Sequence, residues 1–335
     1  MAEWNSLYLR SNGRVESRQA RRYAHDRIIQ TLDSKIYGVA QDGRMASRRR
    51  VLISDRLFTR IERLFDVKAF AQLSVMIAGC GSGGSQVAQF LAMSGLRNFV
   101  LVDNDELQIE NVIRHVCGIR YIGWRKTSAL ADILRDRNPQ VEITEIDLDL
   151  LSWKGLQETI NNVDVVVVGT DSESSRYRLN EVCVETNTPF TVGRVFTRGI
   201  GGEVYAYRPA RSGCLACLEG VLERTHYREG VREVDLATDE DRQKVYDLEI
   251  EEIKDSPGLS VDIGFVVAFH TRFTLDALGN VATIRPKFLT PIDENYLVWA
   301  NRAVPPFSRN FQLQRMTLLP QEDCMVCGGL NELKE

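Results

Sequence analysis

A glycine motif placed between a strand pattern and a helix pattern constrains the fold of this chain most. Val75–Ala78 is a short apolar run of the kind found in buried parallel strands. Gly79, Gly81 and Gly84 follow it at once with the spacing G-x-G-x-x-G. Ser85–Met93 then carries small and apolar residues at helical intervals. Because glycines here permit a tight turn and a close approach of phosphate to a helix N-terminus, the motif predicts a nucleotide-binding loop.

Strand and helix patterns continue to alternate after this loop. Strand patterns occupy residues 98–105, 141–147, 163–171 and 188–192. Helix patterns occupy residues 126–137, which end at Asn138-Pro139, and the segment that carries Cys183. The alternation predicts an α/β fold with a Rossmann-like, doubly wound, mostly parallel sheet covered on both faces. Further on, residues 221–256 are highly charged and predict a surface excursion, 257–278 predict an apolar helix, and the last segment predicts late strands.

The chain divides, on these patterns, into a small N-terminal region over residues 1–70 and one large domain over 71–335. The first region is polar, and we expect it to be helical or irregular. Two stretches in it, RRYAHDRIIQTL and DRLFTRIERLF, have apolar residues at helical spacing. The basic residues 44–50 between them are interpreted as a solvated loop rather than a binding patch.

Charge and hydropathy exclude several classes of function. The formal net charge of -4 provides no basic field that would attract nucleic acid. No run of apolar residues approaches the length of a membrane span, and the N-terminus is too polar for a secretory signal. We therefore expect a cytoplasmic enzyme without a membrane or nucleic-acid partner.

Polar residues at the ends of the predicted strands distinguish between nucleotides. Asp103 lies at the end of the second strand about twenty residues after the loop, where an acid binds ribose in dinucleotide enzymes. Taken alone, the loop and this acid fit NAD as well as ATP. The neighbouring charges favour ATP, because cations neutralise a triphosphate and an aspartate at a strand's carboxyl end holds Mg²⁺. These neighbours are Asp105, Asn111, Arg114, Lys126 and Asp171. Individually, Lys126 also fits a solvated helix residue and Asp171 a helix N-cap.

Four of the seven cysteines form two C-x-x-C pairs. Cys214 and Cys217 make the first pair, and Cys324 and Cys327 make the second. Four thiolates predict the closed tetrahedral site of structural zinc, which would clip two distant segments of one domain together. A redox dithiol and unpaired core cysteines are the alternatives.

The ordered motifs GCGSGGS, LVDNDELQIENVIRH, GWRK, GTDS, CLAC and CMVC resemble the ThiF/MoeB/HesA group of E1-like adenylyltransferases. The resemblance covers roughly residues 70–330. It implies an enzyme that adenylates a carboxylate with MgATP and keeps a zinc at the same cysteine pairs. By motif match, Asp103 would bind ribose, and Asn111, Arg114 and Lys126 would contact the phosphates. Asp171 would hold Mg²⁺.

The resemblance also implies a homodimer in which an arginine ahead of the core reaches the partner's ATP. Arg56 and Arg60 are the candidates, although either one also fits an ordinary helix-surface arginine.

The remaining cysteines concern the second step of E1 enzymes, which is a thioester with the substrate. The family's transfer cysteine usually follows the first zinc pair, and residues 222–255 contain no cysteine. Cys80 and Cys183 are interpreted as core residues, and Cys117 is the one other candidate near the ATP site. We therefore expect no thioester.

The function expected from these observations is adenylation of a carboxylate on a small β-grasp protein or a ribosomal precursor peptide. Maturation enzymes of the microcin and pantocin type belong to the same superfamily and lack a transfer cysteine, which favours a peptide or sulfur-carrier pathway. The alternatives are an E1-like activator of a bacterial ubiquitin-like protein, a non-catalytic E1-like scaffold, and an NAD-dependent oxidoreductase.

Overall fold

The computed structural model describes residues 57–64, 66–196, 199–225, 227, 259–282 and 290–328, with five short strands before residue 53. Its contacts divide the chain into two compact units, Met1–Arg63 and Leu64–Glu335. Among the residues described, no helix is long and apolar enough to cross a membrane.

The N-terminal unit contains strands where we expected helix. β1 (Tyr8–Leu9) pairs with β2 (Val15–Glu16), and β3 (Ile28–Gln30) and β5 (Val51–Leu52) flank β4 (Lys35–Gly38) in a second antiparallel sheet. The helix predicted over RRYAHDRIIQTL is therefore wrong at Ile28–Gln30. The two isoleucines favour a strand once β4 offers a partner, and this pairing outweighs the helical spacing.

The helix predicted over DRLFTRIERLF is also wrong in its described part. Residues 57–64 form turns, in which Ile61 N and Glu62 N both donate to Phe58 O at 2.9 and 3.0 Å. The buried Phe58 anchors this turn.

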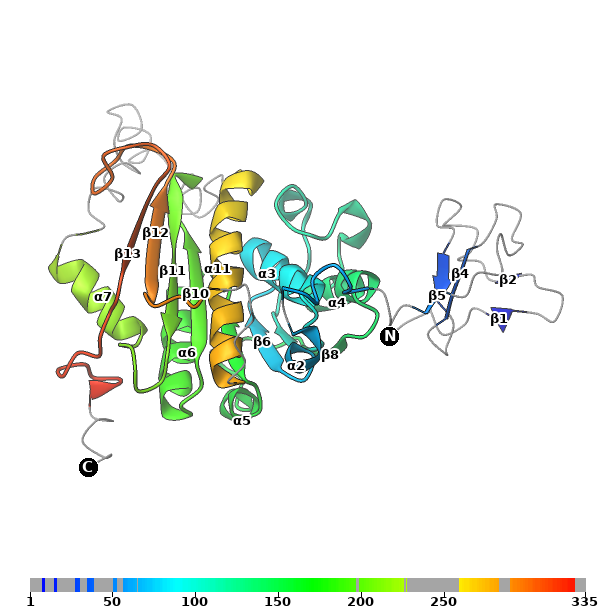
Figure 1. The fold of residues 1–335 in the computed structure, drawn as a ribbon, viewed down its shortest axis with the longest axis horizontal. Helices are drawn as coiled ribbons and strands as arrows, with labels where there is room; N and C mark the ends of the chain where they lie inside the picture. The colour runs from blue at the N-terminus through cyan, green and yellow to red at the C-terminus, as the bar shows by residue number, and fades with distance from the viewer. Residues whose placement is uncertain are drawn as a thin grey trace. The chain divides into compact units, whose positions relative to one another are not determined.

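The second unit is built on one sheet of eight strands in the order β13-β12-β11-β10-β9-β6-β7-β8 (Figure 1). Five neighbouring strands are parallel: β6 (Ser74–Ala78), β7 (Asn98–Val102), β8 (Glu142–Ile146), β9 (Val165–Val168) and β10 (Phe190–Val195). Three antiparallel strands extend them: β11 (Gly201–Tyr207), β12 (Tyr296–Ala300) and β13 (Gln312–Met316). The predicted Rossmann-like, mostly parallel sheet is confirmed, and the late strands join it as an antiparallel extension.

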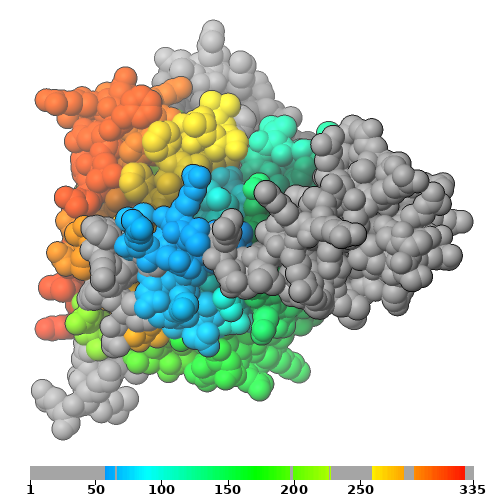
Figure 2. All heavy atoms as spheres, turned by 45° about the vertical axis from the view of Figure 1, so that its right-hand side comes forward, coloured from blue at the N-terminus to red at the C-terminus, as the bar shows by residue number. Residues whose placement is uncertain are grey.

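Helices pack on both faces of this sheet. The helices are α2 (Val67–Phe70), α3 (Ser82–Met93), α4 (Lys126–Arg137), α5 (Leu156–Asn161), α6 (Glu173–Glu185), α7 (Leu215–Arg224) and α11 (Ser260–Val281). α3 contacts both α4 and α11, while α6 contacts both α5 and α7. α11 lies against β10 and β11 and reaches the surface, where Figure 2 draws it in yellow.

Successive side chains of β11 enter two different buried clusters, one on each face of the sheet. Val204 and Ala206 join a buried cluster with Val266 and Phe273 of α11. Tyr205 and Tyr207 point into the larger cluster that contains residues of α6 and α7. Because successive side chains of a strand face opposite sides, one strand supplies both cores.

Candidate functional site

The carboxyl ends of β6, β7 and β9 meet at one edge of the sheet, and the glycine loop follows β6 there. β6 lies between β7 and β9: the chain runs outward from β6 through β7 to β8 and then crosses back to β9 on the other side of β6. Gly79 N donates to Val102 O of β7, and Gly169 N donates to Ala78 O of β6, both at 2.8 Å. Such a switch point is where open α/β sheets bind ligands.

The three motif glycines have two different roles. Gly79 has a φ of 95°, and a Cβ on it would lie 2.6 Å from Thr170 N. A Cβ on Gly84 would lie 1.9 Å from Gly79 O, so neither position accepts a side chain. Gly81, in contrast, has nothing within 4 Å of an added Cβ. The first and third glycines therefore pack the loop, and the second leaves space in which a ligand can approach.

Asp103 braces the glycine loop from the end of β7. Its Oδ2 accepts a hydrogen bond from Cys80 N at 2.7 Å, and its Oδ1 accepts one from Asp105 N at 2.9 Å. Burial raises the pKa of this carboxyl, while the two backbone donors act in the opposite direction. Asp103 thus orders the glycine loop, and its role in binding ribose stays a prediction.

Lys126 begins α4 beside the same loop. Its Nζ lies 2.7 Å from Asp105 Oδ2, and its side chain is 13% exposed against 62% for Asp105. Lys126 N also donates to Asp105 O at 3.0 Å, and this bond joins the start of α4 to the segment that follows β7. The ammonium is therefore held close to the loop by a carboxylate that solvent reaches, rather than being a freely solvated charge.

Asn111 and Arg114 lie on the segment that joins β7 to α4. Asn111 Oδ1 accepts from Gln108 N, and Asn111 O accepts from Arg114 N, each at 3.0 Å. Gln86 of α3 donates from Nε2 to Arg114 O at 3.1 Å, so the segment is attached to the helix of the glycine loop. Arg114 Nε is buried without a hydrogen-bond partner in the described part of the chain. A buried guanidinium nitrogen without a partner, on a segment attached to the helix of the glycine loop, leaves a donor that a ligand could satisfy.

Asp171 lies three residues after the end of β9 and is exposed. The N-cap of α6 is Ser172, whose Oγ accepts from Ser175 N at 3.4 Å, so the N-cap alternative for Asp171 is wrong. Arg176 donates from Nε to Thr170 O at 3.0 Å and fixes the residue before Asp171. The carboxylate is thus free of a capping role, and the backbone of the preceding Thr170 packs closely against Gly79.

Sequence reasoning missed three residues that shape this edge, namely Gln86, His115 and Arg176. Each bonds to a main-chain carbonyl of a predicted site segment. Their one sequence signal is position, because each lies within a few residues of the glycine loop, Arg114 or Asp171.

Of the two arginines proposed to reach a partner subunit, Arg60 is exposed on the turn over residues 57–64. Arg56 lies outside the described residues.

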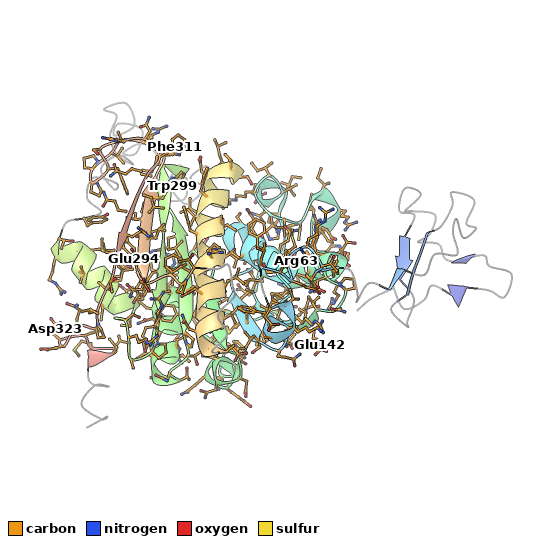
Figure 3. The ribbon with its side chains drawn as sticks, in the orientation of Figure 1. Arg63, Glu142, Glu294, Trp299, Phe311 and Asp323 are labelled. Carbon is orange, nitrogen blue, oxygen red and sulfur yellow. The ribbon has the colours of Figure 1, made fainter. Side chains whose placement is uncertain are left out.

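The two C-x-x-C pairs form one cluster. The four sulfur atoms lie within 4.8 Å of one another. Measured Sγ–Sγ distances are 3.6 Å for Cys214–Cys324, 3.4 Å for Cys217–Cys327 and 4.0 Å for Cys214–Cys217. A tetrahedral zinc with Zn–S bonds of about 2.3 Å separates its sulfurs by about 3.8 Å. The four thiols therefore fit zinc. Figure 3 labels Asp323, the residue before Cys324, near α7.

Protonation of this cluster also suits a metal. Burial raises the pKa of Cys327, and the hydrogen bond from Cys214 lowers the pKa of Cys217. Without a cation, several of the four thiols would stay protonated, because thiolates this close together repel one another. A bound metal displaces these protons and favours the thiolate forms.

The other three cysteines are inaccessible. Cys80, Cys117 and Cys183 are each 0% exposed. Burial raises the pKa of the Cys117 thiol to about 12, and it raises the pKa of Cys80 and Cys183 as well. A nucleophilic thiolate is disfavoured at all three positions. The segment from residue 228 to 258, which has no cysteine, lies outside the described residues.

The ThiF family model matches residues 56–284. The chain is 30% identical over 152 residues to an adenylyltransferase and sulfurtransferase MOCS3-1 of Zea mays, which covers 45% of this chain and 32% of the maize protein. It is 28% identical over 176 residues to the sulfur carrier protein ThiS adenylyltransferase of Escherichia coli K12, covering 52% of this chain and 66% of that protein. Over 181 residues it is 26% identical to the ubiquitin-like modifier-activating enzyme 5 of Caenorhabditis elegans, covering 49% and 43%. The chain thus spans less than two thirds of these relatives.

Solved structures of E. coli MccB share the fold. The structure with ATP has a TM-score of 0.57 at 19% identity and covers 78% of this chain and 69% of MccB. The structure with AMPCPP and the MccA peptide has a TM-score of 0.60 at 17% identity and covers 82% and 75%.

Proposed function

Because the chain belongs to the ThiF family, we propose that it is an adenylyltransferase that activates a carboxylate with ATP. One observation carries the proposal. The open space over Gly81, the unpaired Nε of Arg114 and the exposed carboxylate of Asp171 lie on segments that meet at the carboxyl edge of β6 and β9. An ATP-binding fold neighbour, MccB, supports the nucleotide.

The residues of the site contact different parts of the nucleotide. Asp103 binds the ribose, and the loop at Gly79–Gly84 receives the phosphates at the N-terminus of α3. Asn111, Arg114 and Lys126 contact the phosphate oxygens, and Asp105 holds Lys126 in place until they arrive. Asp171 supplies an oxygen ligand for Mg²⁺, which neutralises charge on the triphosphate when it is bound.

The reaction that this arrangement supports is a single displacement. A carboxylate oxygen of the substrate attacks the α-phosphorus, the bond to the bridging oxygen of the β-phosphate breaks, and pyrophosphate leaves with the electron pair. The products are an acyl adenylate and pyrophosphate. Cations placed around the leaving phosphates stabilise the charge that develops on them, which lowers the barrier.

The substrate class that we favour is a ribosomal precursor peptide or a sulfur-carrier protein. The buried thiols of Cys80, Cys117 and Cys183 support it, because none suits a thioester. The MccB fold neighbour was solved with the MccA peptide. We further propose a cytoplasmic homodimer with a structural zinc at the four clustered cysteines.

A second candidate is the activation of a ubiquitin-like protein with a β-grasp fold. The relatedness to ubiquitin-like modifier-activating enzyme 5 supports it. A scaffold without catalysis is disfavoured by the presence of Arg114, Lys126 and Asp171 around one loop.

ATP–pyrophosphate exchange tests the proposal. Wild-type protein is incubated with MgATP, labelled pyrophosphate and candidate partners encoded beside its gene, which include short peptides and small β-grasp proteins. Exchange that depends on one candidate and disappears in Asp171→Asn identifies both activity and substrate class. Failure of the wild-type protein to bind MgATP at all would contradict the proposal.

A further inference from the structure

Two side chains tie the segment that carries Arg114 to the glycine loop. Gln86 donates from Nε2 to Arg114 O at 3.1 Å. His115 Nε2 lies 2.7 Å from Cys80 O, within the loop itself. Gln86 is half-buried and His115 is 9% exposed, so both bonds lie at or below the molecular surface.

The protonation state of His115 follows from its second contact. Cys117 N donates a hydrogen bond to His115 Nδ1 at 3.0 Å. Because a backbone N–H only donates, Nδ1 carries no proton, and the proton of the neutral ring is on Nε2. Nε2 therefore donates to Cys80 O. Burial lowers the pKa of His115 and so favours this neutral form.

The bond to Cys80 O fixes the orientation of the Gly81 N–H. Cys80 C=O and Gly81 N–H belong to one peptide unit, and in a trans peptide they point in opposite directions. With the oxygen held by His115, the Gly81 N–H is directed away from the imidazole. Gly81 N has no acceptor in the described residues, and nothing lies within 4 Å of a Cβ on Gly81. The preceding Cys80 N–H is bound by Asp103 at 2.7 Å, so this turn of the loop is held on both sides.

We propose that His115 and Gln86 are positioning residues of the nucleotide site. His115 orients the Cys80–Gly81 peptide so that the Gly81 N–H faces a phosphate oxygen. Gln86 and His115 together set the distance between Arg114 and the loop. Both roles rest on the proposed function, since they prepare a donor set for a polyphosphate. An N–H oriented before binding saves the free energy of reorganisation when the nucleotide arrives.

Binding of Mg-AMPCPP, measured by isothermal titration calorimetry, tests the proposal without an acyl substrate. His115→Leu keeps the side-chain volume and removes both ring contacts, and we expect it to weaken binding about tenfold or more. His115→Gln offers one acceptor and one donor on a flexible chain, and we expect it to stay within about threefold of wild type.

His270→Leu is the matched control. His270 is also buried, at 4% exposed, and its Nε2 lies 3.0 Å from Thr191 Oγ1 between α11 and β10. Its replacement is expected to lower thermal stability and to leave the affinity for Mg-AMPCPP unchanged. An effect that reflects only general destabilisation would appear equally in both leucine variants and would overturn the assignment.

Gln86→Ala is a second test variant, and it leaves the buried imidazole of His115 intact. Loss of the bond to Arg114 O is expected to weaken binding by about threefold. The proposal is overturned if Gln86→Ala and a folded His115→Leu bind as tightly as wild type, or if His115→Gln is as weak as His115→Leu. A wild-type protein that does not bind Mg-AMPCPP would instead contradict the proposed function.

Discussion

The glycine-loop edge and the cysteine cluster are two candidate ligand sites of opposite design in one domain. At the loop, Gly81 faces open space, Asp171 is exposed, and Arg114 Nε is buried without a partner in the described residues. At the cluster, four sulfurs lie within 4.8 Å of one another, and three of the four cysteines are buried. An open site suits a substrate that must enter and leave, whereas a closed tetrahedral site suits a resident ion.

The two sites also differ in what their loss does to the fold. The loop residues follow strands that the sheet already orders, so the charged side chains can change without loss of packing. The cysteines join α7 to the segment after β13 across about a hundred residues of chain, and their contact is part of the packing itself. Variants at the first site should therefore change activity, and variants at the second should change stability.

Asp171→Asn is expected to have the largest effect. The substitution removes the proposed carboxylate ligand for Mg²⁺ from an exposed position that makes no cap, so pyrophosphate exchange should fall by about 10²–10³-fold. The thermal unfolding midpoint should stay within about 1 °C of wild type, because surface changes cost little free energy. A variant that keeps most of its exchange rate would exclude the metal role.

Gly84→Ala and Gly81→Ala separate packing from binding within the loop. In Gly84→Ala, the new Cβ would meet Gly79 O at 1.9 Å, and the free energy of unfolding should fall by about 3 kcal/mol. Gly81→Ala should fold with wild-type stability and bind Mg-AMPCPP about tenfold more weakly, since the methyl group occupies the space of the ligand. Chemical denaturation and calorimetry measure the two quantities. Equal destabilisation of both variants would contradict the division of roles.

Cys324→Ser should affect the fold more than the chemistry. We expect one zinc per wild-type chain by elemental analysis, and a lower zinc content in the variant. Since metal binding contributes to folding, the thermal midpoint should fall by roughly 5 °C, which corresponds to about 2 kcal/mol. Purified wild-type protein without stoichiometric metal would refute the zinc site.

Cys117→Ala should have the smallest effect. Its thiol is fully buried, and burial raises its pKa to about 12, so it is not a nucleophile near neutral pH. The exchange rate should remain within about twofold of wild type. Intact mass spectrometry under acidic, non-reducing conditions should detect no hydroxylamine-sensitive adduct after incubation with MgATP and substrate. An adduct that this substitution removes would instead favour the ubiquitin-like pathway.

Several features of the protein were determined by the sequence because their information is local. The apolar run before Gly79 and the helix spacing after Gly84 lie within twenty residues, and they specify strand, turn and helix by periodicity and backbone freedom. The helix predicted over 126–137 has the bounds Lys126–Arg137 in the structure, because Asn138-Pro139 stops it. The C-x-x-C spacing of each pair likewise places two thiols close together, as Cys214 and Cys217 show at 4.0 Å.

Only the tertiary structure decided the features that depend on distant partners. Ile28–Gln30 becomes a strand because β4 pairs with it, against its helical spacing. Asp171 has no capping role because Ser172 is the N-cap of α6. His115 meets Cys80, 35 residues earlier in the chain, and Cys214 meets Cys324, 110 residues later. The physical reason is common to all of them. A long-range contact stabilises the protein only once the strands are arranged in the sheet, and a short stretch of sequence does not contain the order of those strands.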